Sequence, residues 1–203
     1  AAAPPRRRTF CSTRFAMHCI ASRQAQGSPL DRSHPPRGPV CCRCSRPFPL
    51  PPARAVDLAG GTGGTALWLA ANGYEVSLVE ISQAALDVAK REATRRQLKL
   101  LTSHHDLESS TQLDDHWDIA VCCNFLDRPL YSTLHNYVTP KGVLFVKVAT
   151  VTNLERHEKP SRRYLVEPGE LPDLIPGFEP LSYAEDWFDD RHEARMICRR
   201  VID

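Results

Sequence analysis

VDLAGGTGG, residues 56–64, is the stretch on which the fold prediction depends. An apolar run over residues 54–59 leads into closely spaced glycines, and apolar residues at helical spacing follow over residues 62–72. This order predicts a buried parallel strand, a glycine turn and a helix. Such a turn lets a ligand approach the backbone, and the helix start presents N–H groups to an anion. The spacing G-x-G-x-x-A, from Gly61 to Ala66, fits dinucleotide binding equally well.

Strand-like and helix-like segments alternate along the rest of the chain. We predict strands at residues 74–80, 98–103, 117–123, 143–149, 178–187 and 194–201, and helices at residues 82–96, 126–137 and 170–175. Ser82 is the expected N-cap of the first of these helices, Pro129 lies near the start of the second, and residues 189–191 form the last turn. The order predicts an α/β fold: a Rossmann-like, seven-stranded, mostly parallel sheet with helices on both faces and a C-terminal antiparallel hairpin.

Polar side chains lie in or after each of the first four strands. Asp57 is in the first strand, Glu80 ends the second, Asp106 follows the third and Asn124 ends the fourth. Ligands of open α/β sheets bind at the carboxyl ends of the strands. Any one of these residues alone would be an ordinary solvated side chain, but four in this order indicate a binding site.

These residues resemble the first motifs of the class I S-adenosylmethionine-dependent methyltransferases. Asp57, Ala59, Gly61 and Gly63 match the acid and glycines of the family's first motif, with Ala59 in place of the usual first glycine. The resemblance implies that this loop cradles the methionine end of S-adenosylmethionine. It also implies that Glu80 accepts both ribose hydroxyls, which suits a carboxylate with two acceptor oxygens.

The same resemblance assigns the rest of the expected cofactor site. Asp106 would accept a hydrogen bond from the adenine amino group, and Asn124 would face the transferred methyl group. The neighbouring residues Gly60, Ile81 and Leu107 complete the expected cofactor-binding set.

Within the superfamily, residues 53–202 look similar to small bacterial and organellar methyltransferases related to the tellurite-resistance methyltransferase. Such relatives usually begin with an aromatic and acidic helix that covers the cofactor, and residues 1–52 show no comparable pattern. The stretches that carry this resemblance are residues 65–70, 124–130 and 164–171.

The methyl acceptor is expected to be a small molecule, and by family analogy a thiol or a metalloid oxyanion. Tyr131, Arg162 and Arg163 are the expected substrate residues, the two arginines within a basic cluster that also holds Arg156, His157 and Lys159. A base is needed only if the acceptor must lose a proton, and the sequence nominates none among His104, His105, Asp127 and Tyr131. Two other classes stay open: a non-catalytic cofactor-binding protein and an NAD(P)-dependent oxidoreductase.

Composition divides the chain near residue 53. Residues 1–54 hold ten arginines against one aspartate, a charge of +9, whereas the remainder holds sixteen basic and twenty-three acidic residues, a charge of −7. We therefore predict a disordered basic leader over residues 1–52 and one methyltransferase domain over residues 53–203. An arginine-rich, acid-poor leader is typical of plastid or mitochondrial transit peptides, with a cytoplasmic location as the alternative.

The remaining composition argues against several other partners. The negative folded part disfavours nucleic acid, no apolar run is long enough to span a membrane, and we expect a monomer or a weak dimer. Cys41, Cys42 and Cys44 with His34 lack the ligand-pair spacing of a zinc site, so no metal is expected. Cys122 and Cys123 lie in an apolar run and are expected to be buried strand residues rather than nucleophiles.

Overall fold

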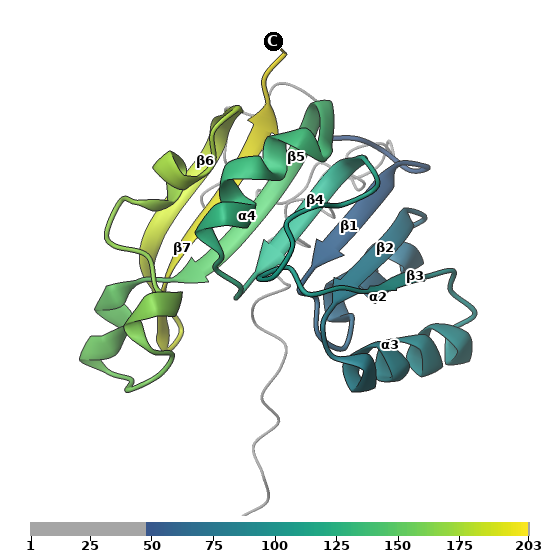
Figure 1. The fold of residues 1–203 in the computed structure, drawn as a ribbon, viewed down its shortest axis with the longest axis horizontal. Helices are drawn as coiled ribbons and strands as arrows, with labels where there is room; N and C mark the ends of the chain where they lie inside the picture. Colours follow the sequence, from purple (N-terminus) through teal and green to yellow (C-terminus); the bar gives the residue numbers. More distant parts are fainter. Residues whose placement is uncertain (1–47, 203) are drawn as a thin grey trace, which may run out of the picture. The chain divides into compact units, whose positions relative to one another are not determined.

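The computed structural model describes residues 48–202, and these residues form a seven-stranded sheet with the strand order β3-β2-β1-β4-β5-β7-β6 (Figure 1). The predicted fold class is confirmed. The strands are β1 (Arg54–Leu58), β2 (Glu75–Glu80), β3 (Leu101–His104), β4 (Trp117–Cys123), β5 (Val138–Ala149), β6 (Phe178–Phe188) and β7 (Arg191–Arg200). The α-helices are α2 (Gly64–Ala71), α3 (Gln83–Arg95) and α4 (Arg128–Thr133). Short 3₁₀ helices are η2 (Leu134–Asn136), η3 (Val151–Glu155), η4 (Arg162–Tyr164) and η5 (Leu171–Leu174).

Strand direction brings the functional ends of the strands to one edge. Strands β1 to β5 pair in parallel, whereas β7 pairs antiparallel with both β5 and β6. In Figure 1 the arrowheads of β1, β4 and β5 therefore point to the lower edge and that of β7 to the upper edge. The carboxyl ends of β1 to β5 and the turn between β6 and β7 consequently share one edge of the sheet.

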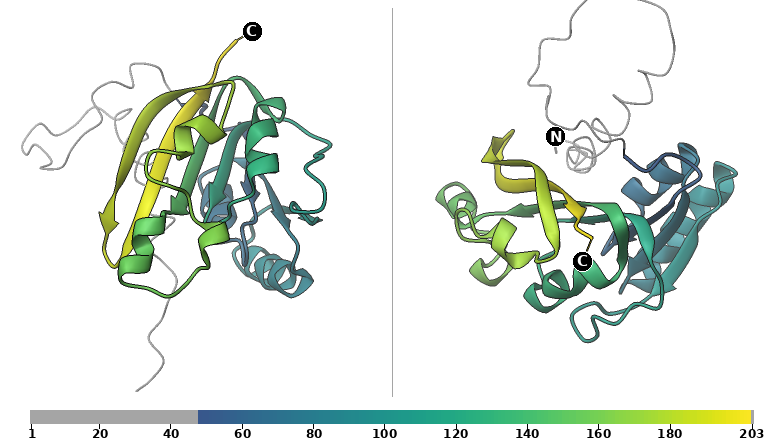
Figure 2. Two further views of the ribbon diagram at one scale, coloured as in Figure 1. Left: turned by 60° about the vertical axis from the view of Figure 1, so that its left-hand side comes forward. Right: turned by 90° about the horizontal axis from the view of Figure 1, so that it is seen from above.

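Helix α2 lies on one face of the sheet and helix α4 on the other (Figure 2). The face that we call the α2 face carries Asp57, which accepts a hydrogen bond from the first turn of α2. The opposite face, the α4 face, buries a core in which Tyr131 and Leu134 pack with Leu58 and Val146. Each fully buried large aliphatic side chain of this kind contributes about 1.5–3 kcal/mol of transfer free energy.

Phe48 is the first residue that the structure describes, and its ring stacks on Phe145 at 5.7 Å between centroids. The hydroxyl of Tyr74 donates to the Pro49 carbonyl at 3.2 Å. Residues 1–47, which hold most of the predicted leader and the cysteines considered for zinc, lie outside the described residues. Within residues 48–202, no helix is long and apolar enough to cross a membrane.

Among the element boundaries that differ from the prediction, two have a clear local reason. Strand β5 begins at Val138 rather than at residue 143, because Val138 already pairs with Trp117 and residues 139–142 form an irregularity within the pairing of β4 and β5. Lys141 takes the positive φ of 68° that this irregularity requires. Strand β7 begins at Arg191 instead of residue 194, because the hairpin closes on Asp189, which has a φ of 58°.

Candidate active site

Asp57 fixes the start of α2 from the middle of the sheet. Its side chain is 2% exposed, and its Oδ2 accepts a hydrogen bond from the Ala66 N–H at 3.1 Å. Burial raises the pKa of Asp57 to about 7, the Ala66 hydrogen bond opposes this rise, and the charge of Glu80 adds to it. The acid therefore connects β1 to the N-terminal turn of α2, where unpaired N–H groups favour an acceptor.

The turn between β1 and α2 has a shape that side chains would obstruct. A Cβ on Gly60 would lie 2.5 Å from both Asp57 Oδ2 and Leu78 Cδ1. Gly63 has a φ of 77°, and its Cβ would lie 3.0 Å from the Ala89 Cβ on α3. At Gly61, with a φ of 58°, no atom lies within 4 Å of where a Cβ would be. The turn is thus closely packed against the protein at Gly60 and Gly63 but open at Gly61. A ligand that lies on the backbone of the turn would require this arrangement.

Glu80 joins the end of β2 to the same turn. Its Oε2 accepts a hydrogen bond from the Gly61 N–H at 2.9 Å, and its Oε1 accepts one from the Ser82 N–H at 2.9 Å. Ser82 caps α3 as predicted, because its hydroxyl accepts from the Ala85 N–H. Each carboxylate oxygen keeps further acceptor capacity, so Glu80 can hold two more donors while it orders the turn.

The other expected cofactor residues lie at the same edge of the sheet. Asp106 follows β3 in a turn, where its Oδ1 accepts from the Glu108 N–H at 3.0 Å, and Leu107 beside it is buried. Ile81 is 55% exposed directly after Glu80, which leaves an apolar surface next to that carboxylate. Asn124 is exposed, has a φ of 60°, and donates its N–H to the Lys147 carbonyl at 2.7 Å.

Comparison with known proteins agrees with this arrangement. The family model described as "Methyltransferase domain" matches residues 55–142, from β1 into β5. The "Putative methyltransferase YqeM" of Bacillus subtilis (strain 168) is 27% identical over 104 residues, which cover 47% of this chain and 42% of that protein. The chain therefore spans less than half the length of this curated relative.

Solved structures show the same fold at low identity. The magnesium protoporphyrin IX methyltransferase of Synechocystis PCC 6803 with bound S-adenosylhomocysteine has a TM-score of 0.66 and 17% identity, covering 93% of this chain and 82% of that chain. TehB of Haemophilus influenzae has a TM-score of 0.63 and 18% identity, covering 74% of this chain and 58% of that chain.

Residues 55–142 match a methyltransferase domain, and the fold is that of S-adenosylmethionine-dependent methyltransferases. The family match spans the glycine turn, Glu80, Asp106 and Asn124, which are the residues that the sequence placed around the cofactor. In the structure, β1, β2 and the backbone of one turn meet at this edge of the sheet.

Tyr131 does not reach the edge where an acceptor would lie. Its side chain is fully buried on the α4 face, and its hydroxyl donates to the Phe125 carbonyl at 2.6 Å. Burial raises the pKa of Tyr131 well above its usual value. The structure therefore does not support the predicted contact between Tyr131 and the acceptor. The tyrosine instead holds the loop after β4 through its hydrogen bond to Phe125.

Two of the remaining base candidates, Asp127 and His105, have structural partners of their own. Asp127 caps α4, because its Oδ2 accepts from the Leu130 N–H at 2.8 Å. The His105 Nε2 lies 2.8 Å from the Ser110 carbonyl oxygen, and His104 is exposed at the end of β3. Cys122 is fully buried in β4, and burial holds its thiol pKa far above the usual range.

Arg162 and Arg163 lie on the exposed loop after β5. Arg162 forms an ion pair with Glu167 at 2.6 Å, and the guanidinium of Arg163 lies over the Tyr164 ring, 4.4 Å from its centroid. Both arginines therefore bond to neighbours in the loop, and neither is brought to the residues of the cofactor edge by a contact that the structure describes.

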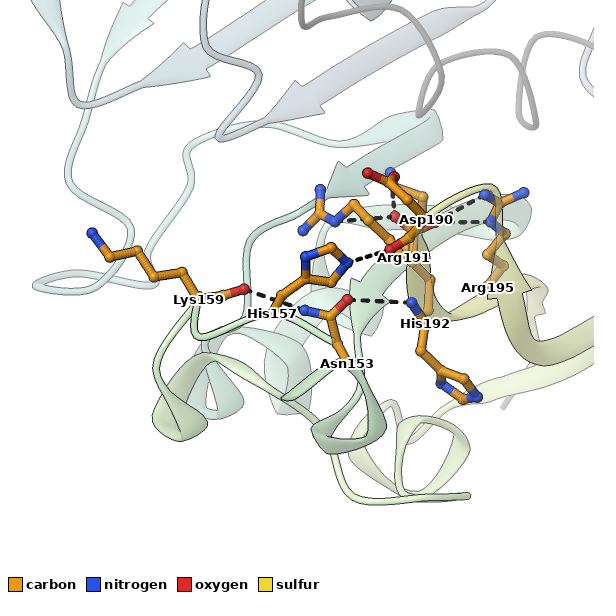
Figure 3. Close-up of polar contacts among 9 residues, drawn as sticks. Asn153, His157, Lys159, Asp190, Arg191, His192 and Arg195 are labelled. Atoms are coloured by element: carbon orange, nitrogen blue, oxygen red, sulfur yellow. Dashed lines mark hydrogen bonds and ion pairs between the residues drawn. The ribbon is translucent and has the colours of Figure 1, made fainter. Parts of the chain in front are cut away.

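The prediction missed a clasp that holds this loop to the β6–β7 hairpin (Figure 3). Asn153, 1% exposed, donates its Nδ2 to the Lys159 carbonyl at 3.2 Å and accepts at Oδ1 from the His192 N–H at 3.3 Å. The His157 Nε2 contacts the Asp190 carbonyl oxygen in the hairpin turn. The loop after β5 and the hairpin thus form one wall at the edge of the sheet where β5 ends and β7 begins.

The prediction also missed a buried charged cluster on the α2 face beside that wall. Lys147, Glu193 and Arg195 are 3%, 3% and 9% exposed, respectively, and Arg191 lies within 3.9 Å of Glu193. A lysine inside the apolar run of β5 was the available signal, because a buried ammonium needs partners. Within residues 48–202, no group of three or more His, Cys, Asp or Glu side chains is placed to hold a metal ion.

Proposed function

We propose that this protein transfers the methyl group of S-adenosylmethionine to a small-molecule acceptor. One observation carries the proposal: two carboxylates, Asp57 and Glu80, hold the two ends of a glycine turn that is open on its outer side. An oxidoreductase reading would explain Glu80 and the glycines but assigns no role to Asp106 after β3. The family match to a methyltransferase domain supports the same choice.

The residues present fit the proposed cofactor. A nucleoside lying across the edge would place its ribose hydroxyls at the free lone pairs of Glu80 and its adenine between Ile81 and Asp106. When bound, S-adenosylmethionine supplies a sulfonium-activated methyl group. Because that carbon is already activated, the chain's main contribution is to hold the acceptor near Asn124 and to exclude water. The wall built by Asn153 and the hairpin lies on the side from which the acceptor would enter.

The acceptor class rests on supporting observations of two kinds. The folded part of the chain is acidic, which opposes binding to phosphate backbones and favours a small molecule over nucleic acid. A thiol or metalloid oxyanion is proposed by analogy with the family that residues 53–202 resemble in sequence. The relation to the tellurite-resistance methyltransferase is accordingly part of the proposal.

Titration calorimetry with three ligands tests the cofactor. We expect S-adenosylhomocysteine and S-adenosylmethionine to bind and NAD to give no heat of binding. NAD binding without S-adenosylhomocysteine binding would contradict the proposal. An acceptor screen by mass spectrometry, which looks for the mass gained when a methyl group replaces a hydrogen, then identifies the product. Methylated RNA without any methylated small molecule would contradict the acceptor class.

We further propose that the arginine-rich residues 1–52 direct the protein to a plastid or mitochondrion. The full chain should enter isolated organelles and be shortened there, whereas a chain with its leader arginines changed to glutamine should stay outside. Equal import of both chains would contradict this proposal and favour a cytoplasmic location.

A further inference from the structure

Lys147 is a buried cation in an otherwise apolar strand. Its Nζ donates to Glu193 Oε1 at 3.1 Å, and no other described hydrogen-bond acceptor is in reach of its remaining N–H groups. An ammonium group has three donors, and leaving donors unpaired in a buried place costs free energy. Burial lowers the pKa of Lys147 and the charge of Glu193 opposes this, so the site is one in which a further negative group would stabilise the cation.

Two arginines compete with Lys147 for its carboxylate partner. Glu193 is shared, because Arg195 donates to its Oε2 at 2.9 Å and Arg191 lies 3.9 Å from its Oε1. Asp186 faces the same side of β6 in register with Glu193, but it is exposed. Lys147, Arg191 and Arg195 thus share the buried carboxylate of Glu193. Figure 3 shows Arg191 and Arg195 near the Asn153 clasp.

The sheet register places this cluster next to the methyl-transfer position. Cys123 of β4 pairs with Lys147, and Lys147 pairs with Arg195 of β7, so the three lie in one row across the sheet. Asn124, the next residue of β4, is exposed and bonds to the Lys147 backbone. Asp57 lies two strands away on the same face, because its row, which contains Phe145, is two residues back along β5 from Lys147.

We propose that the Nζ of Lys147 binds the anionic group of the methyl acceptor, so that the preferred acceptors are small molecules carrying a carboxylate or oxyanion. This inference rests on the proposed function and deepens it. Glu193 positions the lysine and competes with the acceptor for it. The acceptor's reacting atom would then lie near Asn124, and its anionic group would lie at Lys147, in the row of Cys123 on the α2 face.

Two thiols that differ in charge test the proposal. Mercaptoacetate and 2-mercaptoethanol present the same nucleophile, but only the first carries a carboxylate. We expect kcat/KM for mercaptoacetate to exceed that for 2-mercaptoethanol about tenfold, and Lys147→Met to remove the preference, because the variant loses the charge-assisted hydrogen bond to the carboxylate. Lys141→Met, an exposed lysine of the same strand, is the matched control and should keep the preference.

A second readout does not depend on turnover. With S-adenosylhomocysteine bound and ionic strength held constant, mercaptoacetate or selenite should raise the Tm of the wild type and of Lys141→Met but not of Lys147→Met. Glu193→Gln should change the anion response in the opposite direction, to a larger Tm rise, because the competing carboxylate is gone. No anion-dependent rise in the wild type, or an equal rise in Lys147→Met, would overturn the inference.

The cofactor provides the remaining control. S-adenosylhomocysteine affinity should be the same in the wild type and Lys147→Met. If it falls about tenfold or more in the variant, Lys147 serves the cofactor rather than the acceptor, and the inference is overturned while the proposed function stands. Absence of S-adenosylhomocysteine binding in the wild type would instead overturn the proposed function itself.

Discussion

The cofactor half of the domain, β1 to β3 with α2 and α3, and the acceptor half, β4 to β7, build their parts of the site in opposite ways. In the cofactor half, Asp57 and Glu80 hold backbone N–H groups of one turn that lies between them in the sequence. In the acceptor half, Lys147, Glu193 and Asn153 join segments about forty residues apart. Under the proposed function, the cofactor would be held by the backbone of one local turn, and the acceptor by side chains that the fold brings together from distant segments.

The largest effect should come from filling the glycine turn. Gly60→Ala would push a methyl group to 2.5 Å from Asp57 Oδ2 and Leu78 Cδ1, so we expect a loss on the order of 3 kcal/mol in the free energy of unfolding and loss of cofactor binding. Urea unfolding and calorimetry measure the two effects. Gly64→Ala is the control, since no atom lies within 4 Å of its Cβ position and helix propensity favours alanine. Equal behaviour of the two variants would show that the turn is not tightly packed.

Removing the carboxylate of Glu80, which we propose binds the ribose, should weaken cofactor binding. Glu80→Ala is expected to weaken S-adenosylhomocysteine affinity about a hundredfold, because it removes two charge-assisted acceptors and the two N–H contacts that order the turn. Calorimetry measures this, with Glu75→Ala, an exposed residue of the same strand, as the control. Unchanged affinity in Glu80→Ala would remove the basis of the cofactor assignment.

The buried acid of the cofactor half should make stability depend on pH. The pKa of Asp57 is about 7 in the folded protein against an ordinary value of 3.8, so its stabilising contribution is complete below about pH 4 and is lost as the pH rises through 7. Between about pH 5 and pH 8 the wild type should lose roughly 2–3 kcal/mol relative to Asp57→Asn. Urea unfolding of both proteins across this range checks the difference. Parallel stability curves would contradict the raised pKa.

A smaller effect, confined to the acceptor half, should follow from opening the clasp. Asn153→Ala removes the bonds to Lys159 and His192 and should lower the free energy of unfolding by about 1–2 kcal/mol. KM for the acceptor should rise while S-adenosylhomocysteine affinity stays constant. Asn136→Ala, at an exposed asparagine, should change neither. A parallel loss of cofactor affinity would show that the two halves are not independent.

The cofactor half was predictable because its signals are contiguous in the sequence. The strand, the glycine turn and α2 follow one another within residues 54–71. Ser82 indicates the start of α3, because serine is a common N-cap residue. The positions of Asp57 and Glu80 then follow from the rule that sites lie at the carboxyl ends of parallel strands. Strand β4 was predicted residue for residue, because an unbroken apolar run is a local signal as well.

The acceptor half was less predictable because its contacts depend on register. The pairing of Lys147 with Arg195 and its bond to Glu193 follow from how β5 aligns with β7, which no short motif encodes. Tyr131 shows the same limit. Its hydroxyl could contact a substrate or a partner inside the protein. In the structure it donates to the Phe125 carbonyl, and the sequence pattern does not show where that carbonyl lies.

The smallest effect tests the one departure of the cofactor turn from its family pattern. The sequence alone makes alanine at position 59 look harmless, yet Ala59 takes a φ of 50°, in the left-handed region where a Cβ costs about 1–2 kcal/mol. Ala59→Gly removes that cost but adds freedom to the unfolded chain, so we expect a net gain of roughly 0.5–1 kcal/mol in the free energy of unfolding. Ala70→Gly in α2 should instead lose about that amount, since glycine is unfavourable in a helix. Opposite signs in urea unfolding would show that the turn, and not alanine content, sets the effect. A loss in both variants would mean that Ala59 packs more favourably than its backbone angle suggests.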